Sequence, residues 1–174
     1  RRRFGPALAP AMARPPVIVA LDATDMDRVR AMIRATASDV WGFKIGLEFF
    51  VRHGADGIAR SGVDTGQHFL DLKFHDIPNT VAGAVRSAAA IGPAMMTVDA
   101  AGGPAMLAAA RAARDAAADA TGKRPKLLAV TVLTSFDDAD LEAVGQTAPV
   151  GKQARRLATL AQDNGFDGAI CSPR

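Results

Sequence analysis

The chain has 174 residues, which suits one domain with a sizeable core, and its 49% hydrophobic and 22% charged residues are typical of a globular protein. No apolar run approaches the roughly 20 residues needed to cross a bilayer. The single cysteine, Cys171, excludes an internal disulfide framework and favours the reducing cytoplasm. Because it ends a predicted strand, we expect Cys171 to be a buried core thiol.

The net charge of +3 comes from the N-terminal end. Residues 1–16 contain Arg1, Arg2, Arg3 and Arg14 and no acid, so the remaining 17 basic residues stand against 18 acidic ones. Beyond this end, therefore, no excess of positive charge predicts a nucleic-acid interface. Residues 1–15 are predicted to be a disordered, proline-rich extension, followed by a single domain over residues 16–174. The extension is rich in arginine like a transit peptide, but Met12 favours a start of translation at that residue.

Apolar runs typical of buried parallel strands alternate with amphipathic stretches typical of helices. The predicted strands cover residues 17–21, 40–46, 69–74, 95–98, 126–133 and 168–171. Thr24 is predicted to cap a first helix that runs to about residue 37. Further helices are predicted over residues 47–53, 56–60, 81–90, 104–120, 137–144 and 151–164. This alternation predicts an α/β fold with a parallel sheet and right-handed crossovers.

The third predicted strand carries charges in an otherwise apolar run. Asp71 and Lys73 are two residues apart, so an extended strand directs both to one face. Such a pair is costly to bury unless the charges are matched. Pro78 then suits a first helical turn and leaves Asp76 on the loop past the strand. A salt bridge at a strand edge would explain the Asp71–Lys73 pair, but not a second carboxylate at a fixed offset.

Polar side chains recur where predicted strands end. In a parallel barrel these ends share one rim, where active sites are found. Any one of these residues could equally be a helix cap or part of a solvated turn, but the recurrence favours an active site. The residues are Asp22, Lys44, Asp71, Lys73, Asp99, Ser135 and Ser172.

The run Asp71-x-Lys73-x-x-Asp76-Ile77-Pro78-Asn79-Thr80 resembles the signature of the orotidine 5′-phosphate decarboxylase family, and the resemblance extends from about Val17 to the last residue. It implies a (β/α)8 TIM barrel, with six of the eight strands visible in this chain. It also implies decarboxylation of orotidine 5′-phosphate to UMP in pyrimidine biosynthesis. No metal, cofactor, nucleic acid or membrane is implied.

The resemblance also implies roles for matching residues. Asp22 would contact the ribose, Lys44 would bind the ribose and orient Asp71, and Asp71 and Lys73 would be the catalytic pair. Ser135 would hydrogen-bond the pyrimidine. In a homodimer, Asp76, Ile77 and Thr80 would enter the neighbouring subunit's site.

The implied reaction leaves a carbanion at C6 without an electron sink, so the site must supply electrostatic stabilisation. Lys73, flanked by Asp71 and the partner's Asp76, would stay protonated, stabilise the carbanion and donate its proton to C6. Repulsion between Asp71 and the substrate carboxylate would raise the energy of the ground state.

The sequence departs from the family pattern at two places. Asp99 stands where the family usually has histidine, and we expect it to face a lysine or solvent. The family's phosphate site lies on the seventh and eighth strand loops, which have no counterpart here, so we expect the natural chain to continue for roughly 50 to 70 residues.

Two alternatives remain at the level of sequence. The first is a Mg²⁺-dependent sugar-phosphate decarboxylase or aldolase of the same suprafamily, which should lose activity with a chelator. The second is a non-catalytic dimerising barrel module, which would tolerate loss of Lys73.

Overall fold

The computed structural model describes residues 15–64 and 66–172, so the predicted extension lies almost entirely outside the described residues. Six strands form one sheet in the order of the chain, and every neighbouring pair is parallel. The strands are β1 (Ile18–Ala20), β2 (Gly42–Gly46), β3 (His68–Phe74), β4 (Met95–Asp99), β5 (Lys126–Val130) and β6 (Gly168–Ile170).

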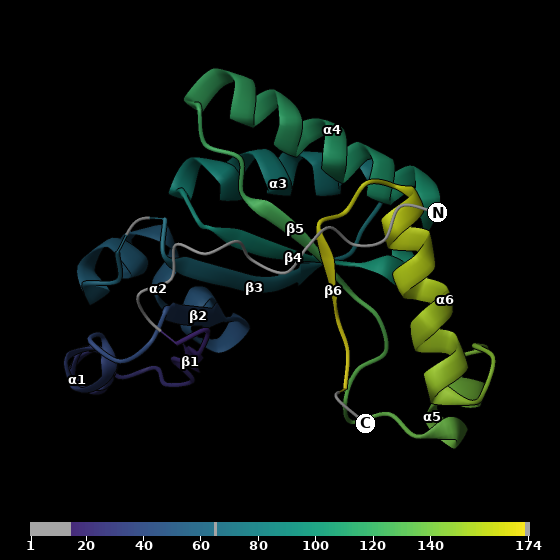
Figure 1. Cartoon of the computed structure of the whole chain (residues 1–174), viewed down its shortest axis with the longest axis horizontal. Coiled ribbons are helices and arrows are strands. Elements are labelled where there is room, and N and C mark those ends of the chain that lie inside the picture. The colour runs from purple at the N-terminus through teal and green to yellow at the C-terminus, as the bar shows by residue number, and fades with distance from the viewer. Residues whose placement is uncertain (1–14, 65, 173–174) are drawn as a thin grey trace.

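Helices connect the strands and cover the outer side of the curved sheet (Figure 1). In Figure 1, α3 and α4 run side by side, α6 flanks β6, and α1 and α2 lie near β1 and β2. None of the helices in the described part of the chain is both long and apolar enough to span a membrane. The helices are α1 (Met26–Thr36), α2 (Leu47–Ser61), α3 (Pro78–Ile91), the 3₁₀ turn η1 (Ala100–Gly102), α4 (Gly103–Thr121), α5 (Asp138–Ala143) and α6 (Val150–Asp163).

The core is organised around a row of apolar residues that crosses the sheet. Ile45, Leu70, Met96 and Leu127 are register partners on β2 to β5, and all four are fully buried. Each such side chain contributes about 1.5–3 kcal/mol relative to an exposed position. The row fixes the register of the strands, and with it the positions of the polar residues at their carboxyl ends.

Several local predictions differ from the structure. Asp25, rather than Thr24, caps α1, because its carboxylate accepts a hydrogen bond from the Arg28 amide at 2.7 Å. The negative charge of Asp25 also interacts favourably with the positive end of the helix dipole. The predicted break between the helices over 47–53 and 56–60 is confirmed, because Gly54 has non-helical backbone angles (φ 61°, ψ −162°) and kinks α2 at this point. The fifth strand ends at Val130 rather than at residue 133.

The prediction of a buried Cys171 is wrong. The thiol is free and exposed, since the residue lies just beyond the end of β6. The predicted short helix over residues 137–144 is confirmed as α5, and Asp137 caps it, because its carboxylate accepts the Asp140 amide in a capping box.

Candidate active site

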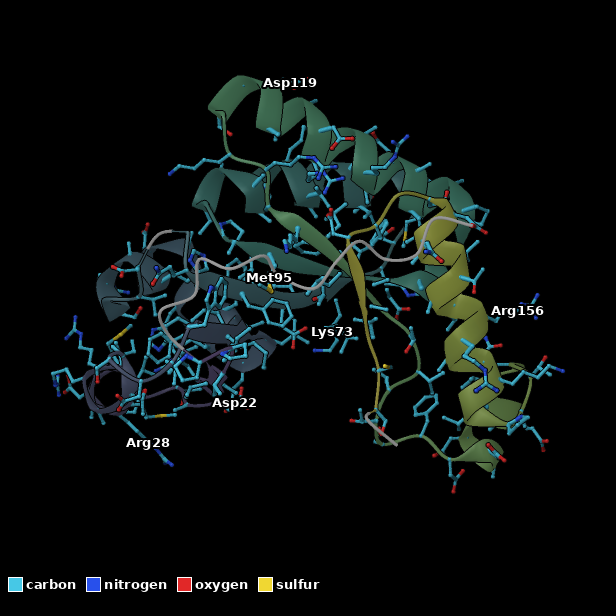
Figure 2. All side chains as sticks on the ribbon, viewed as in Figure 1. Asp22, Arg28, Lys73, Met95, Asp119 and Arg156 are labelled. Carbon is cyan, nitrogen blue, oxygen red and sulfur yellow. The ribbon has the colours of Figure 1, made fainter. Side chains whose placement is uncertain are left out.

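Four charged side chains of alternating sign meet at the carboxyl ends of β1, β2 and β3. Lys73 Nζ donates to Asp71 Oδ2 at 2.9 Å, and Lys44 Nζ lies 3.4 Å from the same oxygen. Lys44 Nζ also lies 3.7 Å from Asp22 Oδ1. The structure therefore brings together four of the residues predicted from the sequence. Figure 2 shows Asp22 and Lys73 on the inner side of the curved sheet, whereas Arg156 projects from the outside of α6.

Gly46 leaves room for part of this network. A Cβ atom at this position would lie 3.3 Å from Asp22 Oδ1 and 3.5 Å from Lys44 Nζ. The first of these contacts is tight, so an alanine here would crowd the Asp22–Lys44 pair. The glycine at the end of β2 thus lets two neighbouring strand ends place opposite charges close together.

Asp71 is the central group of the network and is only 8% exposed. Burial by itself raises the pKa of a carboxyl group, but the Lys73 ammonium, the Thr97 hydroxyl and the Lys44 ammonium together outweigh it, so the pKa of Asp71 is lowered. The site therefore holds a carboxylate at neutral pH with one oxygen shared between two ammonium groups.

The backbone at Lys73 departs from a regular strand. Among the described residues it is the one non-glycine residue with positive φ, at 51°. The pairing of β3 with β4 shifts between Leu70 and Phe74, so residues 71–73 stand opposite Thr97 alone. The predicted contact between Lys73 and Asp71 is confirmed. The regular alternation on which that prediction rested is wrong here, because a bulge interrupts the strand.

Thr97 is a site residue that the sequence reasoning missed. It is fully buried on β4, its hydroxyl donates to Asp71 Oδ1 at 3.0 Å, and it accepts a hydrogen bond from the Lys73 amide at 2.9 Å. A single hydroxyl in an otherwise apolar buried strand, beside a strand carrying Asp and Lys, was the available signal.

The loop after β3 carries Asp76 and Ile77 outward. Asp76 Oδ1 accepts the Ile77 amide at 2.6 Å, and no ion pair among the described residues joins Asp76 to Lys73 of the same chain. Ile77 is 66% exposed. Pro78 begins α3, as predicted, and Thr80 is exposed in the first turn. In the described chain, these three predicted site residues therefore make no hydrogen bond or ion pair with the charge network of their own subunit.

Asp99 was expected to face a lysine or solvent; its side chain is 23% exposed, and its charged neighbour is a histidine rather than a lysine. Its Oδ2 lies 3.3 Å from His75 Nδ1, and its Oδ1 accepts the Ala101 amide at 2.9 Å, where it caps η1. The carboxylate therefore joins the end of β4 to the loop after β3.

Ser135 is exposed in the loop between β5 and α5, and in the described part of the chain no hydrogen bond or ion pair joins it to the charge network. A cavity of about 520 Å³ lies beside it at the carboxyl ends of β5 and β6. Thr134, Phe136 and Ser172 line it, together with the start of α6. Two further cavities lie at the opposite ends of the strands, near Gln67 and His68. Within the described ranges, no group of three or more His, Cys, Asp or Glu side chains is placed to hold a metal ion.

Comparison with known proteins agrees with this arrangement. A family model described as "Orotidine 5'-phosphate decarboxylase / HUMPS family" matches residues 15–174. The chain belongs to this family. Orotidine 5′-phosphate decarboxylase of Rhodospirillum rubrum is 48% identical over 167 residues, covering 94% of this chain and 67% of the relative. The enzyme of the same name from Paramagnetospirillum magneticum is 49% identical, covering 91% and 68%.

A solved structure shows the same architecture. The crystal structure of orotidine 5′-phosphate decarboxylase from Lactobacillus acidophilus superposes with a TM-score of 0.78 at 39% identity, covering 91% of this chain and 71% of that one. The predicted barrel fold, with six strands in this chain, and the predicted enzyme class are confirmed at the level of the family. The chain spans about two thirds of the length of the curated relatives it matches.

Proposed function

We propose that the protein decarboxylates orotidine 5′-phosphate to UMP in pyrimidine biosynthesis, without a metal or another cofactor. The observation that carries this proposal is the buried Asp71 carboxylate, held by the Lys73 and Lys44 ammonium groups at the rim of the sheet. Relatives that carry the decarboxylase name at 48–49% identity support the choice of substrate.

In the proposed reaction, the bond between C6 and the carboxylate carbon breaks, CO₂ leaves, and the electron pair remains on C6. Lys73 supplies a positive charge for this developing carbanion and then transfers a proton from Nζ to C6. The resulting neutral amine regains a proton from solvent before the next turnover. Because such charges are already in place before the reaction, the protein does not have to reorient them as the carbanion forms. Electrostatic stabilisation of this kind is therefore a large component of catalysis.

Asp71 and Lys44 would prepare Lys73 for this step. The carboxylate of Asp71 fixes the ammonium group of Lys73 at 2.9 Å. Its negative charge also faces the place where the substrate carboxylate would lie, so their repulsion is relieved as CO₂ departs. Lys44 balances the charge of Asp71, and with Asp22 it would bind the ribose hydroxyls. Ser135, on the loop after β5, would hydrogen-bond the pyrimidine.

We propose that the active unit is a homodimer in which Asp76, Ile77 and Thr80 enter the neighbouring site. Support comes from the loop after β3, where Asp76 makes no ion pair with its own Lys73 and the apolar Ile77 is 66% exposed. A large exposed apolar side chain beside a carboxylate suits a subunit contact. The partner's Asp76 would then flank Lys73 on the side away from Asp71.

We further propose a cytoplasmic enzyme whose only ligands are small molecules. A single cysteine fits a reducing compartment. Outside residues 1–16 the acidic and basic residues nearly balance, so neither nucleic acid nor an anionic membrane is proposed as a partner.

The test is turnover of orotidine 5′-phosphate by the full-length protein, followed by loss of pyrimidine absorbance and identification of UMP. We expect equal rates with and without a chelating agent. Rates that fall with the chelator and return with Mg²⁺ would instead favour the metal-dependent alternative. No consumption of orotidine 5′-phosphate under either condition would refute the proposed activity.

A further inference from the structure

Thr97 joins the two groups to which the proposed function assigns the chemistry. Its hydroxyl donates to Asp71 Oδ1 at 3.0 Å and accepts from the Lys73 amide at 2.9 Å. The residue is fully buried, so no solvent competes for either hydrogen bond. One hydroxyl group thus contacts the side chain of one member of the pair and the backbone of the other.

The bulge in β3 explains why the backbone of Lys73 needs this acceptor. Since residues 71–73 face Thr97 alone, the regular ladder between β3 and β4 is interrupted there. A buried amide without a partner is costly, and the Thr97 side chain accepts the Lys73 amide in place of a main-chain carbonyl. The same bond holds Lys73 at a φ of 51°, which a side-chain-bearing residue adopts only under constraint.

The hydroxyl also selects which oxygen of Asp71 meets the lysines. Thr97 contacts Oδ1, whereas Lys73 and Lys44 both approach Oδ2, at 2.9 and 3.4 Å. With one oxygen fixed on β4, the carboxylate plane cannot rotate freely, and both ammonium groups meet the remaining oxygen.

We propose that Thr97 is a positioning residue for the reaction, whose hydroxyl fixes the orientation of the Asp71 carboxylate and the backbone of Lys73 at the bulge. This inference rests on the proposed function for its effect on catalysis. The role needs a group that donates and accepts at once, which serine retains and valine lacks.

The experiment compares Thr97→Val with Thr97→Ser in the full-length protein. We expect Thr97→Val to lower kcat about 10- to 100-fold, the range for a lost hydrogen bond to a charged group, and to change KM less than threefold. Thr97→Ser should retain kcat within about threefold. The matched control is Thr131→Val, because Thr131 is also buried and its hydroxyl donates to the Ile170 carbonyl at 2.8 Å. It should lose stability but keep its kcat.

A second readout does not depend on turnover. The groups that face Asp71 are Lys73 on its own strand, Lys44 from β2 and Thr97 from β4, with Asp22 behind Lys44. The Thr97 hydrogen bond lowers the pKa of Asp71, so its removal should raise that pKa. Carboxyl NMR should show Asp71 titrating at higher pH in Thr97→Val than in wild type, with the Lys73 amide resonance displaced.

The outcomes separate this inference from the proposed function. A wild type that does not consume orotidine 5′-phosphate refutes the proposed function, while the titration of Asp71 still tests Thr97. A folded Thr97→Val protein with unchanged kcat and unchanged Asp71 titration overturns the positioning role. Should the valine variant not fold, Thr97→Ala is read by the same two measurements, with the same expected and contradicting results.

Discussion

The ammonium nitrogen of Lys44 lies 3.4 Å from the carboxylate Oδ2 of Asp71, so two adjacent strands, β2 and β3, share one buried negative charge. Lys44 therefore helps to keep the Asp71 carboxylate ionised, in addition to any contact with substrate.

We expect Lys44→Met to lower kcat/KM about 10- to 100-fold, the loss that accompanies removal of one interaction with a charged group. The pKa of Asp71 should rise, because one of its two ammonium neighbours is gone. Steady-state kinetics and carboxyl NMR would measure the two effects. The control is Lys126→Met, at the exposed start of β5. Unchanged kcat/KM in Lys44→Met would contradict this role.

The proposed exchange of Asp76 between subunits predicts complementation. Lys73→Ala and Asp76→Asn proteins should each be inactive as homodimers, but a hybrid contains one site with both residues intact. Random mixing in equal amounts should therefore restore about one quarter of wild-type activity in a closed dimer. Hybrids would be verified by native mass spectrometry. Verified hybrids without activity would assign Asp76 to the site of its own chain.

The opposite ends of the strands hold a second ion-pair network, which should contribute to stability. Arg114 is fully buried, and its Nη1 donates to Asp167 Oδ2 at 2.6 Å, while the same oxygen accepts the Leu127 amide. Arg114→Met should lower the free energy of unfolding by about 1.5–3 kcal/mol, because Asp167 loses a charge-assisted hydrogen bond although it keeps its ion pair with Arg124. Chemical denaturation would measure it, with exposed Arg111→Met on the same helix as control. Equal losses in both variants would contradict the account.

His68 should make stability depend on pH near neutrality. Burial lowers the pKa of its imidazole below the ordinary 6.5, so the unfolded chain binds more protons than the folded one as pH falls below that value. Stability should therefore decrease as pH is lowered from 7 toward 5. Asp71 and Asp167 do not contribute in this window, because their pKa values lie below 3.8. His68→Leu should weaken this dependence. An unchanged slope in His68→Leu would show that another group is responsible.

The sequence predicted the elements and the contact between Asp71 and Lys73, because apolar periodicity and strand ends are local features of the chain. Lys44 and Asp22 could be assigned to the same rim for the same reason, since parallel strands end on one side. In the structure, the register that pairs Ile45 with Leu70 brings Lys44 on β2 close to Asp71 on β3, and Lys44 also lies near Asp22 after β1.

Other features depended on pairing that no local pattern reveals. The positive φ of Lys73 and the two hydrogen bonds of Thr97 follow from a bulge that exists only when β3 lies beside β4. The contact of Asp99 with His75 likewise joins the end of β4 to the loop after β3, which the sequence separates. Reasoning from single strands therefore missed the hydroxyl and the imidazole that contact two of the predicted carboxylates.

The central claim is that Lys73 both stabilises the carbanion and protonates C6. The most direct test is kcat for orotidine 5′-phosphate in Lys73→Ala, with UMP binding and melting temperature measured alongside and Lys126→Ala as the matched control. We predict a loss of about 10⁴-fold or more in kcat, because an electrostatic contribution of about 10²–10³ and a proton-transfer contribution of about 10²–10⁴ are removed together. A folded Lys73→Ala protein that binds UMP and turns over at the wild-type rate would contradict the account.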